Sequence, residues 1–432
     1  MIKAKTKTDT KNYLKKLDRI LEEKHLIEKK KLFIQTKKIF KIVIDFIIKK
    51  KLLVYGGYAV NSILPKSKRF YNGYELPPDI DIFSTNSKND AIELTNILFQ
   101  NGYKFSEVKV GIHYETFKIY VNFMPIVDIT NISKQFFNIM LQISNSEKKD
   151  IMKYASDCKI NIVPLAFLRL SLHLELSRPR GYIDRWIKLY KRMTLLYDYY
   201  PIPLMNTCDG FFKDHSKRFL EIKNKLYEIV EQLDLIIIGM DAIKVYLNKG
   251  GINIPEDFIL HKHMTVVDII SPKYINHTNL IISFLKPYLQ SNEKLTFKKY
   301  SSLNKGDLLP YHTIIYFITT IDNEDRSRPL IGVYESNACY AYKIINKHKI
   351  ASIDTILSFM YAWLLIQRSY LNKEKLKCIL SWLLHIQYKF LESKKLEFHL
   401  FEQKCQGKQL EISEMKEQMW SKGTDKVVYR PK

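Results

Sequence analysis

The chain has 432 residues and carries a net charge of +24 at pH 7, from 69 Lys and Arg against 45 Asp and Glu. A hydrophobic content of 46% and an aromatic content of 13% exclude a peptide or a largely disordered protein. Such an excess of positive charge on folded domains is typical of proteins that bind a polyanion, so the composition predicts nucleic acid as the first partner.

The N-terminal region holds nearly half of the excess charge, because residues 1–51 contain 17 basic and 6 acidic side chains. We predict a basic arm over residues 1–30. Apolar residues then recur at helical spacing from Leu32 to Ile48, which predicts an amphipathic helix over residues 31–50. Its lysine face is either a solvated surface or a contact for nucleic acid.

The next segment alternates short strands and helices. Residues 52–55 predict a buried strand, Gly56-Gly57 a turn, and residues 58–64 a helix. The run Asp79-Ile80-Asp81-Ile82-Phe83 alternates acidic and aliphatic residues, so it predicts a strand with both carboxylates on one face. A helix over residues 88–101 capped by Gly102, and strands over 115–121 and 125–130, complete the predicted order β-α-β-α-β-β.

Residues 160–200 predict helices rich in basic and aromatic side chains. The Arg178-Pro179-Arg180 segment is a candidate contact for phosphate or RNA, because Arg offers paired donors, although surface ion pairs explain it equally well. Three aromatic side chains of this region are either stacking surfaces for bases or core residues: Tyr182, Trp186 and Tyr190.

A weak repeat follows downstream. Residues 237–243 resemble residues 54–60, and residues 267–271 resemble residues 80–84, at a similar separation. This small number of identities is compatible with a true duplication and also with chance. If the duplication is real, the second copy has lost its chemistry, because Met240 replaces the second Gly and Val266 replaces the first Asp.

The candidate chemistry lies on three aspartates. Two carboxylates at positions i and i+2 of one strand, with a third on a neighbouring strand, can hold two divalent cations for nucleotidyl transfer. Asp79, Asp81 and Asp128 form such a set. Mg²⁺ needs few protein carboxylates beside substrate phosphate. The Gly56-Gly57 turn at a helix N-terminus would let backbone N–H groups approach phosphate oxygens.

Cysteine usage and hydropathy bear on the compartment. The five cysteines are far apart and form no CxxC pair, so the spacing predicts neither a disulfide framework nor a zinc site, and a reducing compartment fits best. The longest strongly apolar stretch, residues 235–240, is too short for a membrane helix of roughly 20 residues. The N-terminus lacks a signal-peptide pattern. We therefore predict a cytoplasmic protein without a membrane partner.

These motifs resemble the polymerase β nucleotidyltransferase superfamily. Residues 54–61, 78–83 and 174–181 are similar to the catalytic poly(A) polymerases of poxviruses and giant DNA viruses of the mimivirus type. The resemblance implies an α+β fold: a polymerase β-like nucleotidyltransferase domain, with a mixed sheet and flanking helices, then a second, degenerate nucleotidyltransferase-like domain and C-terminal helices. The corresponding division is arm 1–30, catalytic domain 31–200, degenerate domain 205–390 and charged tail 391–432.

The resemblance also implies a function. The chain would add AMP from ATP to RNA 3′ ends without a template, as in mRNA polyadenylation. Two Mg²⁺ or Mn²⁺ ions would be held by Asp79, Asp81 and Asp128, and the triphosphate by Gly56 and Gly57, with Arg178 and Arg180 as further contacts.

Three matters stay open at this point. Another RNA terminal nucleotidyltransferase, uridylyl-transferring or CCA-adding, would share these motifs. A non-catalytic RNA-binding scaffold subunit is the alternative from another class, although three intact aspartates argue against it. The protein partner could be a second copy of the chain or a viral processivity subunit. The location of the chain could be the host cytoplasm or the virion.

Overall fold

The computed structural model describes most of the chain, in two compact units. The first unit comprises residues 1–131, 148–163 and 423–432, and the second comprises 132–147 and 164–422. The described residues are 7–71, 79–113, 115–181, 183–205, 208, 211–212, 217–254, 258–259, 267–300, 308–366, 373–392, 404–422 and 426–432.

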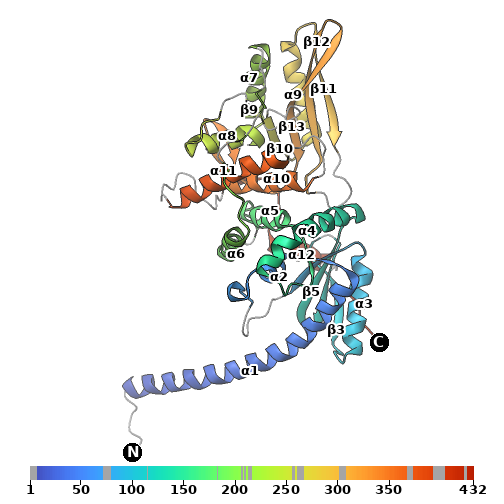
Figure 1. Cartoon of the computed structure of the whole chain (residues 1–432), viewed down its shortest axis with the longest axis vertical. Helices are drawn as coiled ribbons and strands as arrows, with labels where there is room; N and C mark the ends of the chain where they lie inside the picture. The colour runs from blue at the N-terminus through green and yellow to red at the C-terminus, as the bar shows by residue number, and fades with distance from the viewer. Residues whose placement is uncertain are drawn as a thin grey trace, which may run out of the picture. The chain divides into compact units, whose positions relative to one another are not determined.

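The first unit is a mixed sheet with flanking helices (Figure 1). Its strands lie in the order β17-β3-β4-β5-β2-β1-β6, in which β1 is antiparallel to β2 and β2 is parallel to β5. The helix α2 contacts β1 and β2, and α3 contacts β3, β4 and β5. The elements are α1 (Lys7–Lys50), β1 (Leu53–Tyr55), α2 (Gly56–Ile63), η1 (Lys66–Lys68), β2 (Ile80–Ser84), α3 (Ser87–Gln100), β3 (Ser106–Val110), β4 (Thr116–Val121), β5 (Met124–Asn131), β6 (Asn161–Ile162) and β17 (Val427–Tyr429).

Most predicted elements of this unit are confirmed to within a residue or two, but the division into arm and helix is wrong, and three strands, β3, β6 and β17, were not predicted. The arm and the amphipathic helix are one continuous helix, α1, and among its described side chains burial starts at Thr36. A strand that we did not predict, β3, pairs with β4 and β17. Its fully buried positions are only Ser106 and Val108, so it carries too little apolar periodicity to stand out from a loop.

The C-terminal segment is part of the first sheet. Tyr429 donates a hydrogen bond to Asn96 at 2.6 Å, and Arg430 forms an ion pair with Glu107 at 2.7 Å. The last residues of the predicted charged tail are therefore held by backbone pairing to β3 and by these side chains.

The second unit is built on another mixed sheet, with strand order β11-β12-β13-β10-β8-β15-β14-β16. The helix α9 contacts β10, β12 and β13, whereas α8 contacts β8 and β10 and is itself contacted by α10 and α11 (Figure 1). The elements are α5 (Leu165–Leu176), η2 (Ile183–Arg185), α6 (Trp186–Tyr199), β7 (Phe211–Phe212), α7 (Lys217–Gln232), β8 (Ile236–Ile238), α8 (Gly239–Lys249), β9 (Phe258–Ile259), β10 (Val267–Ser271), α9 (Tyr274–Leu285), η3 (Lys286–Tyr288), β11 (Glu293–Tyr300), β12 (His312–Ile321), β13 (Glu324–Glu335), β14 (Tyr340–Ile345), β15 (His348–Ala351), α10 (Ile353–Leu365), α11 (Lys373–Glu392), β16 (Cys405–Gln406) and α12 (Ile412–Ser421); α4 (Lys134–Tyr154) runs across the boundary between the units.

The two sheets repeat one topology, so the duplication is confirmed. The order β3-β4-β5-β2-β1-β6 corresponds strand by strand to β11-β12-β13-β10-β8-β15, with the same directions of pairing. Asp81 pairs with Tyr55 and Asp128, and Asp268 correspondingly pairs with Ile238 and Gly332. The second copy thus keeps one aspartate and has glycine in place of Asp128; Val266 lies outside the described residues.

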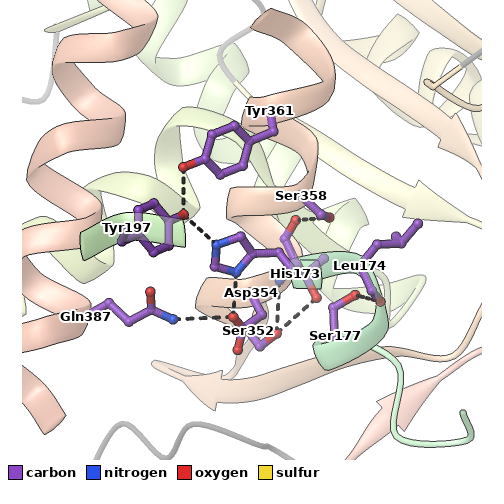
Figure 2. Close-up of polar contacts among 10 residues, drawn as sticks. His173, Leu174, Ser177, Tyr197, Ser352, Asp354, Ser358, Tyr361 and Gln387 are labelled. Atoms are coloured by element: carbon purple, nitrogen blue, oxygen red, sulfur yellow. Dashed lines mark hydrogen bonds and ion pairs between the residues drawn. The ribbon is translucent and has the colours of Figure 1, made fainter. Parts of the chain in front are cut away.

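Residues 164–200, which we grouped with the catalytic domain, belong to the second unit. Figure 2 shows the reason: a buried polar network ties α5 and α6 to α10 and α11. His173 lies 2.8 Å from Asp354 through Nδ1 and 2.9 Å from the Tyr197 hydroxyl through Nε2. The Tyr197 hydroxyl also contacts that of Tyr361 at 2.6 Å, and Gln387 donates to Asp354 at 3.3 Å.

Several basic and aromatic side chains of the predicted helical region are interior. Arg169, Arg192 and Trp186 are each at most 6% exposed. Arg169 donates to the backbone carbonyl of Tyr200 and lies over the Tyr197 ring. These three side chains are therefore part of the core, which removes Trp186 from the candidate RNA contacts, whereas Tyr182 lies outside the described residues.

The prediction of no disulfides is wrong. Cys208 is bonded to Cys378 and Cys339 to Cys405, with Cα atoms 5.7 and 5.1 Å apart, distances that suit a disulfide. The partners are separated by 170 and 66 residues, so only the fold brings them together. Cys158 is free and half-buried.

Among the described residues, no helix combines the length and the apolar character that a bilayer span requires.

The buried network should stabilise the second unit. We expect Asp354→Ala to lower the free energy of unfolding by about 2 kcal/mol, because it leaves the imidazole of His173 buried without its partner. Urea unfolding followed by tryptophan fluorescence measures the change. Glu374→Gln, which removes an exposed carboxylate at the start of α11, is the control and should change stability by less than about 0.5 kcal/mol. Equal effects would contradict the role of the network.

Candidate active site

The three predicted aspartates lie together on the first unit's sheet. Asp81 of β2 and Asp128 of β5 are register neighbours on parallel strands, so their side chains project from the same face about 5 Å apart at the backbone. Asp79 immediately precedes β2, and Lys118 lies within ion-pair distance of both Asp79 and Asp128. The structure thus brings together a set of side chains that the alternation pattern and sequence order only suggested.

Gly56 lies against this set at the start of α2. Its φ of +69° is in the left-handed region, and a Cβ built on it would stand 2.1 Å from Oδ2 of Asp81. Glycine is therefore required twice, by the backbone conformation and by the close approach of the carboxylate. Gly57 follows as the second residue of α2, so the first N–H groups of this helix lie at the end of the sheet that carries the acids.

Lys118 is one residue of this site that sequence reasoning missed. It belongs to β4 and pairs in register with Asp128 of β5. Its Nζ lies 2.9 Å from Oδ2 of Asp128 and 3.2 Å from Oδ2 of Asp79. Burial lowers the pKa of the Lys118 ammonium, but the two carboxylates outweigh burial and raise that pKa above its ordinary value. The hairpin of β4 and β5, with its short turn, was the signal that could have paired Lys118 with Asp128.

Tyr55 was not predicted at the site either. Its ring stacks on Phe83 with centroids 4.0 Å apart, and its hydroxyl lies 3.0 Å from that of Thr130, which lies 2.9 Å from that of Thr116. Burial and the neighbouring charge of Asp81 raise the pKa of the Tyr55 phenol, so it stays protonated. These three linked hydroxyl groups lie beside the acids.

One oxygen of Asp128 has no hydrogen-bond partner in the part of the chain that the structure describes. Oδ1 is buried and accepts no hydrogen bond from the described residues, while Oδ2 contacts Lys118. Burial raises the pKa of the Asp128 carboxyl to about 6, against the opposing effect of Lys118. A buried carboxylate oxygen without a donor, beside a second carboxylate on the next strand, suits a divalent cation with oxygen ligands. As the side chains stand, no three His, Cys, Asp or Glu among the described residues converge on one point.

Arg178 and Arg180 belong to the second unit. Arg178 is half-buried, its guanidinium lies over the Tyr340 ring, and Nη2 donates to the Tyr340 hydroxyl at 3.2 Å. It lines a cavity of about 320 Å³ together with Ser336 and Ser358. Arg180 is exposed. Their predicted role in substrate binding stays a prediction.

Comparison with known proteins covers the segment that carries these residues. Residues 41–181 match the family described as "Poly(A) polymerase catalytic subunit". This segment contains Gly56, Gly57 and the three aspartates. The chain resembles viral poly(A) polymerase catalytic subunits. The resemblance drawn from the sequence motifs is therefore confirmed.

Individual relatives extend the likeness. A candidate poly(A) polymerase catalytic subunit of Acanthamoeba polyphaga mimivirus is 24% identical over 385 residues, which cover 79% of this chain and 60% of the relative. A candidate catalytic subunit of African swine fever virus (strain Badajoz 1971 Vero-adapted) is 31% identical over 171 residues, or 38% of this chain and 33% of the relative. The chain thus spans less than two thirds of the length of these relatives.

The fold is shared with a solved viral structure. The crystal structure of the Megavirus polyadenylate synthase matches with a TM-score of 0.73 and 20% identity, covering 98% of this chain and 84% of that chain. The predicted α+β fold is confirmed by this match, and the predicted second copy is confirmed by the repeated strand order and register.

Gly102 is a control for Gly56, because it shares the positive φ but not the close contact with a carboxylate. Gly102 also has positive φ, at +92°, but a Cβ there would meet nothing within 4 Å. We expect Gly102→Ala to cost about 1 to 2 kcal/mol from backbone strain, and Gly56→Ala about 1 to 3 kcal/mol more, because its Cβ must displace Asp81. Urea unfolding of both variants checks this. Equal losses would mean that Asp81 does not pack on Gly56.

The Asp128 carboxyl predicts a pH dependence of stability. Its pKa is about 6 in the fold against 3.8 ordinarily, so the metal-free folded state loses stability as the pH rises from about 4 to about 6 and keeps that loss at higher pH. Asp128→Asn should therefore raise the free energy of unfolding by about 3 kcal/mol at pH 7.5. The gain should vanish near pH 4, where both carboxyl and amide are neutral. Unfolding in EDTA at several pH values measures it, and a pH-independent difference would contradict the assigned burial.

Proposed function

We propose that the chain is a template-independent poly(A) polymerase that adds AMP from ATP to RNA 3′ ends. The observation that carries this proposal is the pairing of Asp81 with Asp128 on parallel strands, against a left-handed glycine at a helix start. This pairing lies within the segment that matches poly(A) polymerase catalytic subunits. The positive charge of the chain suits an RNA substrate.

In this proposal the RNA 3′ oxygen forms a bond to the α-phosphorus of ATP, the bond to pyrophosphate breaks, and the hydroxyl proton is lost to solvent. Asp79, Asp81 and Asp128 would hold the Mg²⁺ or Mn²⁺ ions. Such ions neutralise the triphosphate and favour ionisation of the attacking hydroxyl. Backbone N–H groups at the start of α2 would donate to phosphate oxygens, which the absence of a Cβ at Gly56 and Gly57 permits.

The same chain supplies candidates for holding RNA. Arg180 is exposed and is free to meet a phosphate, whereas Arg178 already has Tyr340 as its partner. The exposed N-terminal part of α1 carries lysines over several turns. We propose these groups as phosphate contacts, and a second copy or a viral processivity subunit as the protein partner.

The deciding experiment supplies the purified protein with an RNA primer, Mg²⁺ or Mn²⁺, and one ribonucleotide at a time. A ladder with ATP alone supports poly(A) synthesis. A ladder with UTP would identify a uridylyltransferase, and addition of C, C and A in turn a CCA-adding enzyme. Absence of extension with every nucleotide, in protein that binds RNA, would identify a scaffold.

Asp81→Ala and Asp268→Asn form a matched pair in this assay, because the two residues occupy equivalent positions in the repeated sheets. Asp81→Ala should reduce AMP addition to less than about a tenth of wild type, since metal ligation is lost. Asp268→Asn should leave single AMP addition within about threefold, because Gly332 provides no second carboxylate there. Single-turnover rates measure both, and a large loss in folded Asp268→Asn would indicate a second active site.

A further inference from the structure

Lys118 occupies the space between two of the proposed metal ligands. Its ammonium contacts Oδ2 of Asp128 and Oδ2 of Asp79, and about a quarter of the side chain is exposed. Within the described residues, no other Lys or Arg forms an ion pair with either carboxylate. The single positive charge of Lys118 is thus shared between two carboxylates of the site.

The position of Lys118 follows from the sheet and not from a flexible loop. Lys118 lies in the middle of β4, in register with Asp128 on the antiparallel strand β5. Side chains of such register neighbours project from the same face. Thr116, two residues earlier on the same face, contacts Thr130 of β5 at 2.9 Å, so the two strands are also linked at the register position beside the acid. The ammonium is therefore delivered to the carboxylates by strand pairing.

The second unit provides an internal comparison. Its sheet has the same strand order and the same pairing, and Ile314 stands where Lys118 stands, opposite Gly332 in place of Asp128. The lysine and the acid are thus both missing from the copy that keeps only Asp268. This sheet forms with an isoleucine at the position, so the topology itself does not require a lysine. The lysine is therefore associated with the acidic residues and not with the strand topology.

We propose that Lys118 is a positioning residue: an internal counter-ion that holds Asp79 and Asp128 together until a divalent cation takes its place. This inference rests on the proposed function, because it assumes that these carboxylates bind the metal. Two carboxylates that share one cation repel each other when it is removed. A divalent cation at the same oxygens must displace the ammonium, whereas Oδ1 of Asp128 is buried and accepts no hydrogen bond from the described residues.

The displacement has a measurable consequence. Metal binding without nucleotide is weakened, because two ion pairs must be given up for each ion bound there. Removal of the ammonium should therefore tighten metal binding while it loosens the metal-free protein. A merely structural lysine would do the second and not the first.

The test is Mn²⁺ binding to the full chain without nucleotide, measured by electron paramagnetic resonance of free Mn²⁺. We expect Lys118→Met to bind Mn²⁺ at least fivefold more tightly than wild type, and Lys118→Arg to stay within twofold of wild type. Lys109→Met is the matched control, since Lys109 is the register neighbour of Lys118 on β3 and pairs with Glu107. It should stay within twofold.

If Lys118→Met is too unstable for the binding measurement, the effect of Mn²⁺ on its melting temperature provides a second test. Added Mn²⁺ should raise the melting temperature of Lys118→Met by several degrees more than that of wild type or Lys109→Met. The double variant Lys118→Met/Asp128→Asn, which removes both charges, should fold without metal and lose the gain. Equal Mn²⁺ affinity and equal Mn²⁺-induced shifts in Lys118→Met and Lys109→Met would overturn the inference.

The two proposals fail separately. If wild type extends RNA with ATP and Lys118→Met binds Mn²⁺ no more tightly, the counter-ion role is wrong and the proposed function stands. If Asp81→Ala binds Mn²⁺ as wild type does and no variant extends RNA, the metal site and the proposed function are both wrong.

Discussion

The site depends on the close approach of a strand carboxylate to a left-handed glycine. Asp81 lies where a Cβ of Gly56 would be, so the strand β2 and the start of α2 can meet only if the helix begins with glycine. The second unit repeats this contact, since a Cβ on Gly239 would lie 2.3 Å from Oδ2 of Asp268. This contact survives where the other acids are missing, which indicates that it supports the fold as well as any chemistry.

Charge balance is the second constraint on the site. Asp128 is mostly buried, and burial disfavours its ionised form. Lys118 compensates from the neighbouring strand, so the carboxylates can stay close without a metal. In the second unit Gly332 and Ile314 occupy these positions and no such compensation is needed. The two sheets therefore differ in the charges that they must accommodate, while their hydrogen-bonded frameworks are alike.

The second unit is held together by a polar interior as well as an apolar one. His173, Asp354 and Tyr197 connect three helices through hydrogen bonds, one of them buried and the other part-buried. This network explains why α5 and α6 belong with the second unit although they follow the first in sequence. A division based on motif order alone places the boundary near residue 200, since it cannot detect contacts across 181 residues.

The sequence by itself determined the elements around the acids, because alternation of Asp with Ile and a Gly-Gly pair before a helix are local signals. It also indicated the duplication from a few residues near Gly239 and Asp268. Only the tertiary structure decided which side chains meet. Lys118 reaches Asp128 through strand register, Gly332 replaces Asp128 at a position 64 residues beyond Asp268, and Cys208 meets Cys378 across 170 residues. These pairings come from sheet order and helix packing, which act over distances in sequence that no local pattern covers.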